Sequence, residues 1–254
     1  MNQEVTITET PPATTSLLPA EKTPPALEAT TAKVLLYGPP KIGKTTLAAG
    51  IDPDRTLFLA CEPGLGGQEV FQMSIGTWKE FLTACAELAK DKASDAPRFT
   101  TIIIDTVDEL AKICAADQLQ QLGIVHASDA GYGKGYAVIS DEFRRCINKL
   151  SGLGYGVWFI SHAKQREVKT AVGDVSKIEP SLSGSIADYL KGFCDFIFYA
   201  EKVATENGEE RVLRTAAGAN FEAGSRIKLP DPLLLDAETV RTAMATACGP
   251  KESN

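Results

Sequence analysis

Apolar residues along this chain fall into short, near-continuous runs that are separated by longer helix-forming stretches. The short runs are typical of buried strands, and the longer stretches indicate helices. The predicted strands are Lys33–Tyr37, Thr56–Ala60, Thr100–Ile104 and Tyr155–Ile160, and the predicted helices are Thr45–Gly50, Thr77–Lys90, Thr106–Leu122 and Tyr136–Leu150. Because strands alternate with helices, we expect an α/β fold with a mostly parallel sheet flanked by helices.

The two ends of the chain differ from this body. Residues 1–30 are rich in Thr, Pro, Ala and Glu without a sustained apolar period, which predicts a disordered arm. Residues 31–246 are expected to form one domain. Within it, Phe193–Val203 and Arg211–Thr215 flank an Asn-Gly pair, which predicts a C-terminal antiparallel hairpin. Residues 247–254 are expected to form a flexible tail.

One motif carries specific chemistry. The segment Gly38-Pro39-Pro40-Lys41-Ile42-Gly43-Lys44-Thr45 matches the phosphate-binding pattern G-x-x-x-x-G-K-[ST] between a predicted strand and a predicted helix. Its backbone N–H groups and the helix N-terminus, with Thr46, would hold the phosphates. Lys44 would reach the β- and γ-phosphates, and the Thr45 hydroxyl would bind Mg²⁺. The alternative is a plain Gly/Pro turn, but the context favours a site for ATP with Mg²⁺.

A second part of the site follows the apolar run Thr101–Ile104. Asp105 ends this run as the acid of a Walker B strand does, and it would hold Mg²⁺ through a water opposite Thr45. The alternative is an aspartate that caps the next helix. Asp108 and Glu109 lie one turn further on, and we expect both to be solvated acids of the first helical turn.

Two further strand ends carry polar residues. Glu62 follows the strand Thr56–Ala60, and if that strand neighbours the phosphate-loop strand, Glu62 would polarise the attacking water. A turn-forming Glu before Pro-Gly is the alternative. Ser161 and His162 end the strand beyond Walker B and would sense the γ-phosphate, although a hydrogen-bonded structural His is the alternative. His126 is expected at the surface.

Composition narrows the class of protein. The 254 residues are 44% hydrophobic, without an apolar run near 18 residues and without the pattern of a secretory signal. The six cysteines are scattered, which favours reduced thiols in a cytoplasmic protein and no membrane partner. The net charge of −7 gives no global indication of nucleic-acid binding, although a local basic patch is compatible with it.

Taken together, these strand ends resemble the RecA-like branch of P-loop ATPases. Residues 33–232 resemble the phage-encoded AAA-domain group that includes single-strand-annealing recombination ATPases. The resemblance implies that Glu62 is catalytic, that Asp105 holds magnesium, and that Ser161-His162 senses the γ-phosphate and opens a DNA-binding loop. The segments 131–136 and 160–164 are typical of the phage group.

The resemblance also implies assembly. RecA proteins carry two cations, two residues apart and shortly before a Pro, that reach the nucleotide of the neighbouring subunit. Arg226 and Lys228 before Pro230 have this spacing, which implies a homo-oligomer with nucleotide at the interface. The chain departs from RecA in having His162 where RecA has Gln. It shows no separate N-terminal oligomerisation segment and has no room for a C-terminal DNA-capture domain, so a stripped RecA core is expected.

Two loops would correspond to the DNA loops of the family. Residues 128–136 carry Lys134 between Tyr132 and Tyr136, and residues 164–177 carry four cations against two acids, a local net charge of +2. Basic tracks with stacking aromatics are typical of single-strand binders. The predicted DNA contacts are Lys134, Lys164, Arg166 and Lys169. The alternative is a solvated mobile loop.

The leading hypothesis is therefore a Mg²⁺-dependent ATPase with a RecA-like core that binds single-stranded DNA. It would act with phage recombination or replication proteins in the host cytoplasm. One alternative is a small-molecule or nucleotide kinase, for which the only candidate lid, residues 164–177, contains a single Arg. Another is an accessory ATPase that acts on a protein partner.

Overall fold

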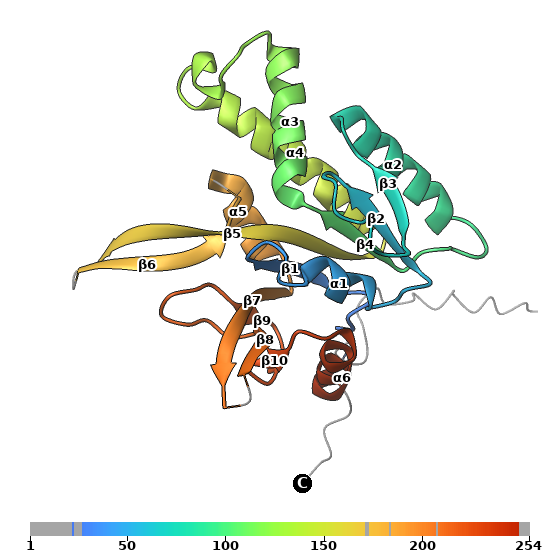
Figure 1. Cartoon of the computed structure of the whole chain (residues 1–254). Helices are drawn as coiled ribbons and strands as arrows, with labels where there is room; N and C mark the ends of the chain where they lie inside the picture. Colours follow the sequence, from blue (N-terminus) through green and yellow to red (C-terminus); the bar gives the residue numbers. More distant parts are fainter. Residues whose placement is uncertain (1–21, 23–26, 171–172, 183, 207, 249–254) are drawn as a thin grey trace, which may run out of the picture.

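The computed structural model describes residue 22 and residues 27–170, 173–182, 184–206 and 208–248 (Figure 1). Its elements in chain order are β1 (Lys33–Gly38), α1 (Lys44–Ala49), β2 (Thr56–Ala60), β3 (Phe71–Ser74), α2 (Trp78–Lys92), β4 (Thr101–Asp105), α3 (Val107–Leu122), the 3₁₀ turn η1 (Ala127–Ala130), α4 (Lys134–Gly152), β5 (Gly156–Thr170), β6 (Gly173–Pro180), α5 (Gly184–Phe193), β7 (Phe196–Thr205), β8 (Gly208–Arg214), β9 (Gly224–Ser225), β10 (Leu233–Leu234) and α6 (Ala237–Cys248).

The strands form one mixed sheet with the order β10-β8-β7-β1-β5-β4-β2-β3. The strands from β7 to β3 in this order pair in parallel, and β8 and β10 continue the sheet in antiparallel fashion. The expected α/β core with a C-terminal antiparallel hairpin is therefore confirmed. Parallel pairing brings the carboxyl ends of β1, β5, β4 and β2 to one edge, which is where the candidate site lies.

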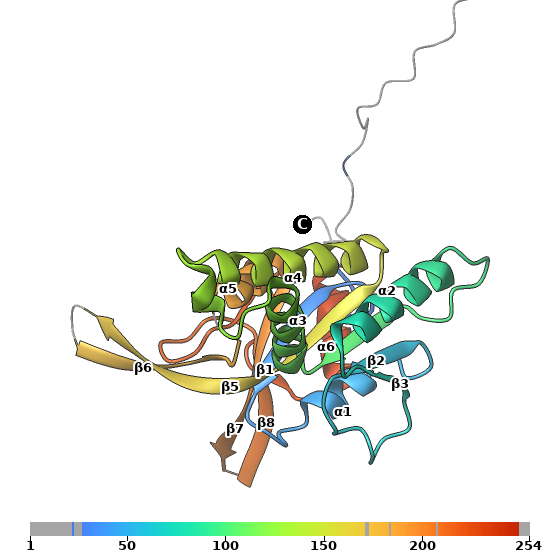
Figure 2. The ribbon, with the colours of Figure 1, turned by 90° about the horizontal axis from the view of Figure 1, so that it is seen from above.

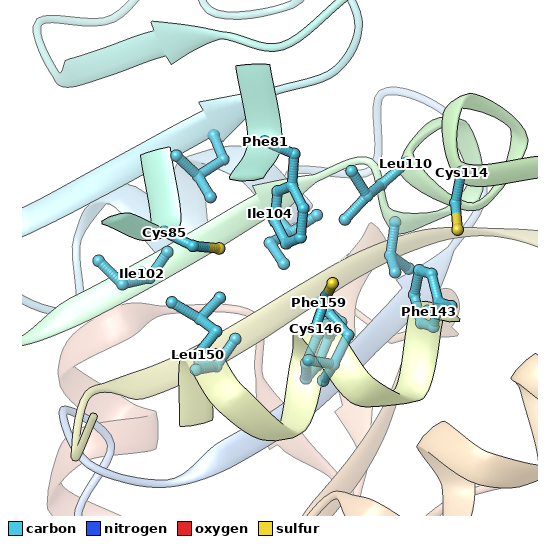
Figure 3. Close-up of a cluster of buried hydrophobic side chains, with 14 of the residues drawn as sticks. Phe81, Cys85, Ile102, Ile104, Leu110, Cys114, Phe143, Cys146, Leu150 and Phe159 are labelled. Atoms are coloured by element: carbon cyan, nitrogen blue, oxygen red, sulfur yellow. The ribbon is translucent and has the colours of Figure 1, made fainter. Parts of the chain in front are cut away.

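Helices cover both faces of the sheet (Figure 1). One face packs against α2, α3, α4 and α5, and the other packs against α1 and α6. Alternate residues of the buried strands point to opposite faces of the sheet. In β4, Ile102 and Ile104 pack on the face covered by α2–α5, and Ile103 packs on the face covered by α1 and α6. In Figure 3, Phe81 of α2 lies against Ile104, and Phe143 of α4 belongs to the same cluster. This double burial explains why the strands are apolar at consecutive positions.

A two-stranded arm projects from the sheet. Strand β5 continues far beyond its pairing with β1 and β4 and forms an antiparallel hairpin with β6. Both views show this hairpin extending away from the body (Figures 1 and 2). The prediction of a loop over residues 164–177 is therefore wrong for the described part, because cross-strand pairing runs from Ala163 with Pro180 outward.

The packed domain extends beyond its predicted limits at both ends. Ala29 is buried, and its carbonyl oxygen accepts a hydrogen bond of 2.9 Å from the Trp158 indole. Residues 27–30 therefore belong to the domain, and residues 1–21 and 23–26 of the predicted arm lie outside the described residues. Helix α6 reaches Cys248, two residues into the predicted tail. Among the described residues, no helix has the length and apolar character that a membrane span requires.

Candidate nucleotide-binding site

The phosphate loop joins β1 to α1, and two of its glycines are required by the local geometry. Gly43 has a φ of 114°, in the left-handed region that favours glycine. At Gly38, an added Cβ would lie 2.5 Å from the carbonyl oxygen of Ala200 on β7. The first turn of α1 has neither a side-chain cap nor an acid. Its backbone N–H groups are therefore available to an anion.

Lys44 is buried at the centre of this loop. Its ammonium donates hydrogen bonds of 2.9 Å to the carbonyl oxygens of Gly38 and Pro39. Burial lowers the pKa of Lys44, and the nearby carboxylates of Asp105 and others oppose that shift. The charge is thus held in a low-dielectric environment, where it interacts strongly with any phosphate that enters the loop.

Thr45 and Asp105 form the candidate magnesium site. The Thr45 hydroxyl donates a hydrogen bond of 2.8 Å to the Asp105 carboxylate, which joins α1 to the end of β4. Asp105 is 7% exposed, and burial raises its pKa despite the hydrogen bond from Thr45. A divalent cation would relieve this desolvated carboxylate, and magnesium prefers oxygen ligands of this kind. The two side chains therefore fit a hydrated Mg²⁺.

The strand order corrects two details of the sequence prediction. The strand of His162, β5, lies between β1 and β4, so it is not beyond the Walker B strand. Strand β2, which leads to Glu62, pairs with β4 and not with β1. Both residues still reach the site edge because all of these strands are parallel. The register places Gly38 opposite His162, and Asp105 opposite Ile160.

Glu62 and His162 meet at this edge. The Nε2 atom of His162 lies 3.3 Å from the Glu62 carboxylate, and the two side chains are 37% and 31% exposed. The Nδ1 atom of His162 is buried and has no hydrogen-bond partner among the described residues. The negative charge of Glu62 acts to raise the pKa of both Lys44 and Asp105. A half-exposed carboxylate here is placed to accept a proton from a water at the phosphate loop.

Asp108 contradicts its prediction as a solvated acid. It is 8% exposed and accepts hydrogen bonds from the Ser161 hydroxyl at 2.8 Å and from the His162 amide at 2.7 Å. Helix α3 turns Asp108 inward onto the end of β5, whereas Glu109 pairs with Lys112 at its surface as expected. Ser161 is fully buried and its hydroxyl donates to Asp108, so a contact of Ser161 with nucleotide stays a prediction.

The predicted pair Arg226 and Lys228 lies at the other edge of the sheet. The Arg226 side chain is 3.0 Å from the Asp195 carboxylate, which also accepts a hydrogen bond from the Lys33 amide. Lys33 begins β1 and the phosphate loop follows its far end. Arg226 therefore does not join the site of its own subunit, Lys228 is exposed two residues further on, and a role of the pair in a neighbouring subunit stays a prediction.

The predicted DNA contacts occupy different surroundings. The Lys164 ammonium donates a 2.6 Å hydrogen bond to the Leu182 carbonyl and lies 3.5 Å from Glu179, so it stabilises the base of the hairpin. Arg166 is exposed and lies 3.7 Å from the same Glu179. Lys134 is exposed at the start of α4. The side chain of Lys169 lies outside the described residues. His126 is exposed, as predicted.

Two neighbours of the loop were missed by sequence reasoning. Gln68 donates a hydrogen bond of 3.0 Å to the Thr46 hydroxyl. Arg211 of β8 donates one of 3.3 Å to the Ile42 carbonyl. Both contacts join segments that are distant in sequence, and neither residue belongs to a motif, so the sequence carries no signal for them.

Comparison with known proteins supports the assignment of a nucleotide-binding P-loop domain. A family model described as "AAA domain" matches residues 30–227. The chain is also similar to the SPbeta prophage-derived uncharacterized protein YorG of Bacillus subtilis (strain 168), with 31% identity over 134 residues. That alignment covers 52% of this chain and 41% of the relative, so the chain matches less than half of the relative's length. Because the family match spans most of the chain and agrees with the phosphate loop, this protein belongs to the AAA domain family of P-loop proteins.

Proposed function

We propose that this protein hydrolyses Mg²⁺-ATP and couples the reaction to single-stranded DNA in phage recombination or replication. The observation that carries the proposal is the convergence of Lys44, Thr45, Asp105, Glu62 and His162 from four parallel strand ends at one edge. This set contains a phosphate-binding lysine, two metal-binding oxygens, a carboxylate for the attacking water and a polar sensor, which are the parts that phosphoryl transfer to water requires.

Each side chain has a distinct task in this reaction. Lys44 exchanges its loop carbonyl partners for phosphate oxygens and stabilises their negative charge. Thr45 and Asp105 hold the cation, which when bound neutralises charge on the phosphates. Glu62 accepts the proton of the attacking water. His162, in contact with Glu62, reports whether a γ-phosphate is present.

The support for DNA as the partner is the position of the β5–β6 hairpin. Strand β5 runs from His162 directly into the hairpin, so a change at the γ-phosphate reaches the arm through one continuous strand. Arg166 on this arm is exposed, and Tyr132 and Lys134 are exposed at the start of α4. Cations and open aromatic rings suit a single strand. In this proposal, Arg226 and Lys228 of an adjacent copy complete the nucleotide site of a homo-oligomer.

A cavity beside the site favours a second candidate function, phosphoryl transfer to a small molecule. It has a volume of about 730 Å³, lies between α3, α4 and α5, and is lined by His162 and Asp108 at one end. Its walls include Leu119, Ile139 and Ile186, which would suit an acceptor with an apolar part. The described part of the hairpin contains a single arginine, Arg166, which disfavours it as the arginine-rich lid of a kinase.

One experiment separates these functions. Phosphate release from ATP is measured for the full chain with Mg²⁺, with and without single-stranded DNA of mixed sequence, and Lys44→Ala serves as the control. We expect turnover that DNA stimulates and that the Lys44→Ala chain lacks, because no other buried cation among the described residues lies at the loop. Turnover that DNA leaves unchanged would refute the DNA part of the proposal. Phosphate that appears only on an added small molecule would favour the kinase.

A further inference from the structure

Asp108 occupies a position that no part of the P-loop motif accounts for. It lies in the first turn of α3, after the metal-binding Asp105, and its carboxylate is buried against the end of β5. Burial raises the pKa of Asp108, and the hydrogen bonds from the His162 amide and the Ser161 hydroxyl oppose the shift. Burial of an acid costs stability unless hydrogen bonds replace its lost hydration. A buried acid at this position therefore suggests a role for its contacts.

Two successive contacts connect Asp108 to Glu62, the proposed general base. Its carboxylate accepts the backbone N–H of His162 at 2.7 Å, which fixes the main chain at that residue. The imidazole of His162 then lies 3.3 Å from the Glu62 carboxylate. Because the Nδ1 atom of His162 has no partner among the described residues, the ring is oriented by its backbone and by Glu62.

From this geometry we propose that Asp108 is a positioning residue for ATP hydrolysis. It holds the end of β5 so that His162 keeps Glu62 at the place where the attacking water is activated. The inference rests on the proposed ATPase function and deepens it, because it links helix α3, which follows Asp105, to the general base Glu62. Asp108 itself touches neither phosphate nor metal in this mechanism. Its loss should therefore change turnover and leave nucleotide affinity intact.

The chemistry of the contact predicts which substitution preserves it. In Asp108→Asn, the amide oxygen can still accept the His162 N–H, and the amide nitrogen can donate to the Ser161 oxygen. The Ser161 hydrogen then goes to the His162 carbonyl, which already lies 3.1 Å away. Asp108→Ala offers no acceptor and leaves the buried N–H without its partner. Glu109→Ala is the matched control, since Glu109 is the adjacent acid and its carboxylate, within the described part of the chain, pairs only with Lys112 at the surface.

The test compares the three variants with the wild-type chain by ATP affinity and by turnover at saturating ATP. We expect Asp108→Ala to lower turnover about tenfold to a hundredfold, the scale for a misplaced catalytic group, with unchanged ATP affinity. Asp108→Asn and Glu109→Ala should retain most of the turnover. Normal turnover in Asp108→Ala, equal losses in the Ala and Asn variants, or a loss of ATP affinity in Asp108→Ala would each overturn the positioning role.

A spectroscopic measurement tests the contact itself. The chain has two histidines, so ¹⁵N-histidine labelling gives two backbone amide signals, and His126→Ala identifies the one from His162. A short hydrogen bond to a carboxylate should shift the His162 amide proton downfield, and Asp108→Ala should abolish this shift. An unshifted signal would refute the contact. If the wild-type chain shows the shift but does not turn over ATP, the contact stands while the proposed function, and the catalytic role of Asp108 with it, fails.

Discussion

The hydroxyl of Tyr37 links strand β1, which leads into the phosphate loop, to Glu222, whose carboxylate contacts strand β6 of the hairpin. Tyr37 precedes Gly38 on β1 and is fully buried. Its hydroxyl donates to the Glu222 carbonyl at 2.5 Å and accepts from the Glu222 amide at 3.0 Å. The Glu222 carboxylate pairs with Lys177 of β6 and Lys191 of α5. Tyr37→Phe removes this tie without changing the packing of the ring.

The size of the effect follows from these contacts. The single hydroxyl hydrogen of Tyr37 is shared between the carbonyl oxygens of Glu222 and Ile178, the latter at 3.3 Å, and the hydroxyl oxygen accepts the Glu222 amide. The substitution therefore removes the equivalent of two hydrogen bonds, each with a net contribution of about 1 kcal/mol, and the Glu222 amide keeps a weaker bond to the Ile178 carbonyl at 3.3 Å. We therefore expect Tyr37→Phe to lower the free energy of unfolding by about 2 kcal/mol. For a chain of this size, the corresponding decrease in Tm is about 4–8 °C.

Urea denaturation followed by circular dichroism measures this difference, with thermal unfolding as a second readout. Tyr199→Phe is the matched control, because its ring packs 5.1 Å from that of Tyr37 and its hydroxyl has no hydrogen-bond partner among the described residues. The control should change stability by less than about 0.5 kcal/mol. A Tyr37→Phe chain as stable as the control would refute the assigned role of the hydroxyl.

The remaining predictions concern DNA and assembly. If Lys164 and Arg166 contact DNA phosphates, replacing both with Gln should flatten the salt dependence of single-strand binding by up to about 1.4 log units per log unit of salt. An unchanged slope in a salt titration would exclude that contact. If Arg226 and Lys228 act in a neighbouring subunit, the double Ala variant should bind ATP but hydrolyse it poorly, and mixing it with Lys44→Ala chains should restore activity. Mixtures that assemble but stay inactive would exclude the role in trans.

The parts of the fold that sequence could predict are those with strong local patterns. The four buried strands, their helices and the phosphate loop have continuous apolar runs or a motif with one structural solution. Short elements such as β3 and β10 lack such a pattern, since β3 is a mostly exposed edge strand and β10 has two residues. Strand order is likewise a long-range property, and this explains why the sequence does not predict that β5 lies between β1 and β4.

The site shows the same division between local and long-range information. Lys44, Thr45 and Asp105 belong to motifs whose spacing predicts their roles, and the structure brings them together. Asp108 follows a pattern that is also typical of solvated helix starts, and only the packing of α3 against β5 reveals its buried contacts. The place of Ser161 at a strand end predicts a contact with nucleotide, but the sequence does not reveal its hydrogen bond to Asp108, which depends on that same packing.

The most direct test of the central claim is the turnover of Glu62→Gln. The amide keeps the shape of the side chain and removes the base, so ATP should bind with wild-type affinity while turnover falls by at least about tenfold. Lys44→Ala provides the contrasting result, in which binding itself is lost. Affinity is measured with a fluorescent ATP analogue, and turnover by phosphate release with Mg²⁺ and single-stranded DNA. If Glu62→Gln hydrolyses ATP at the wild-type rate, the carboxylate beside His162 is not the general base and the account of the site is contradicted.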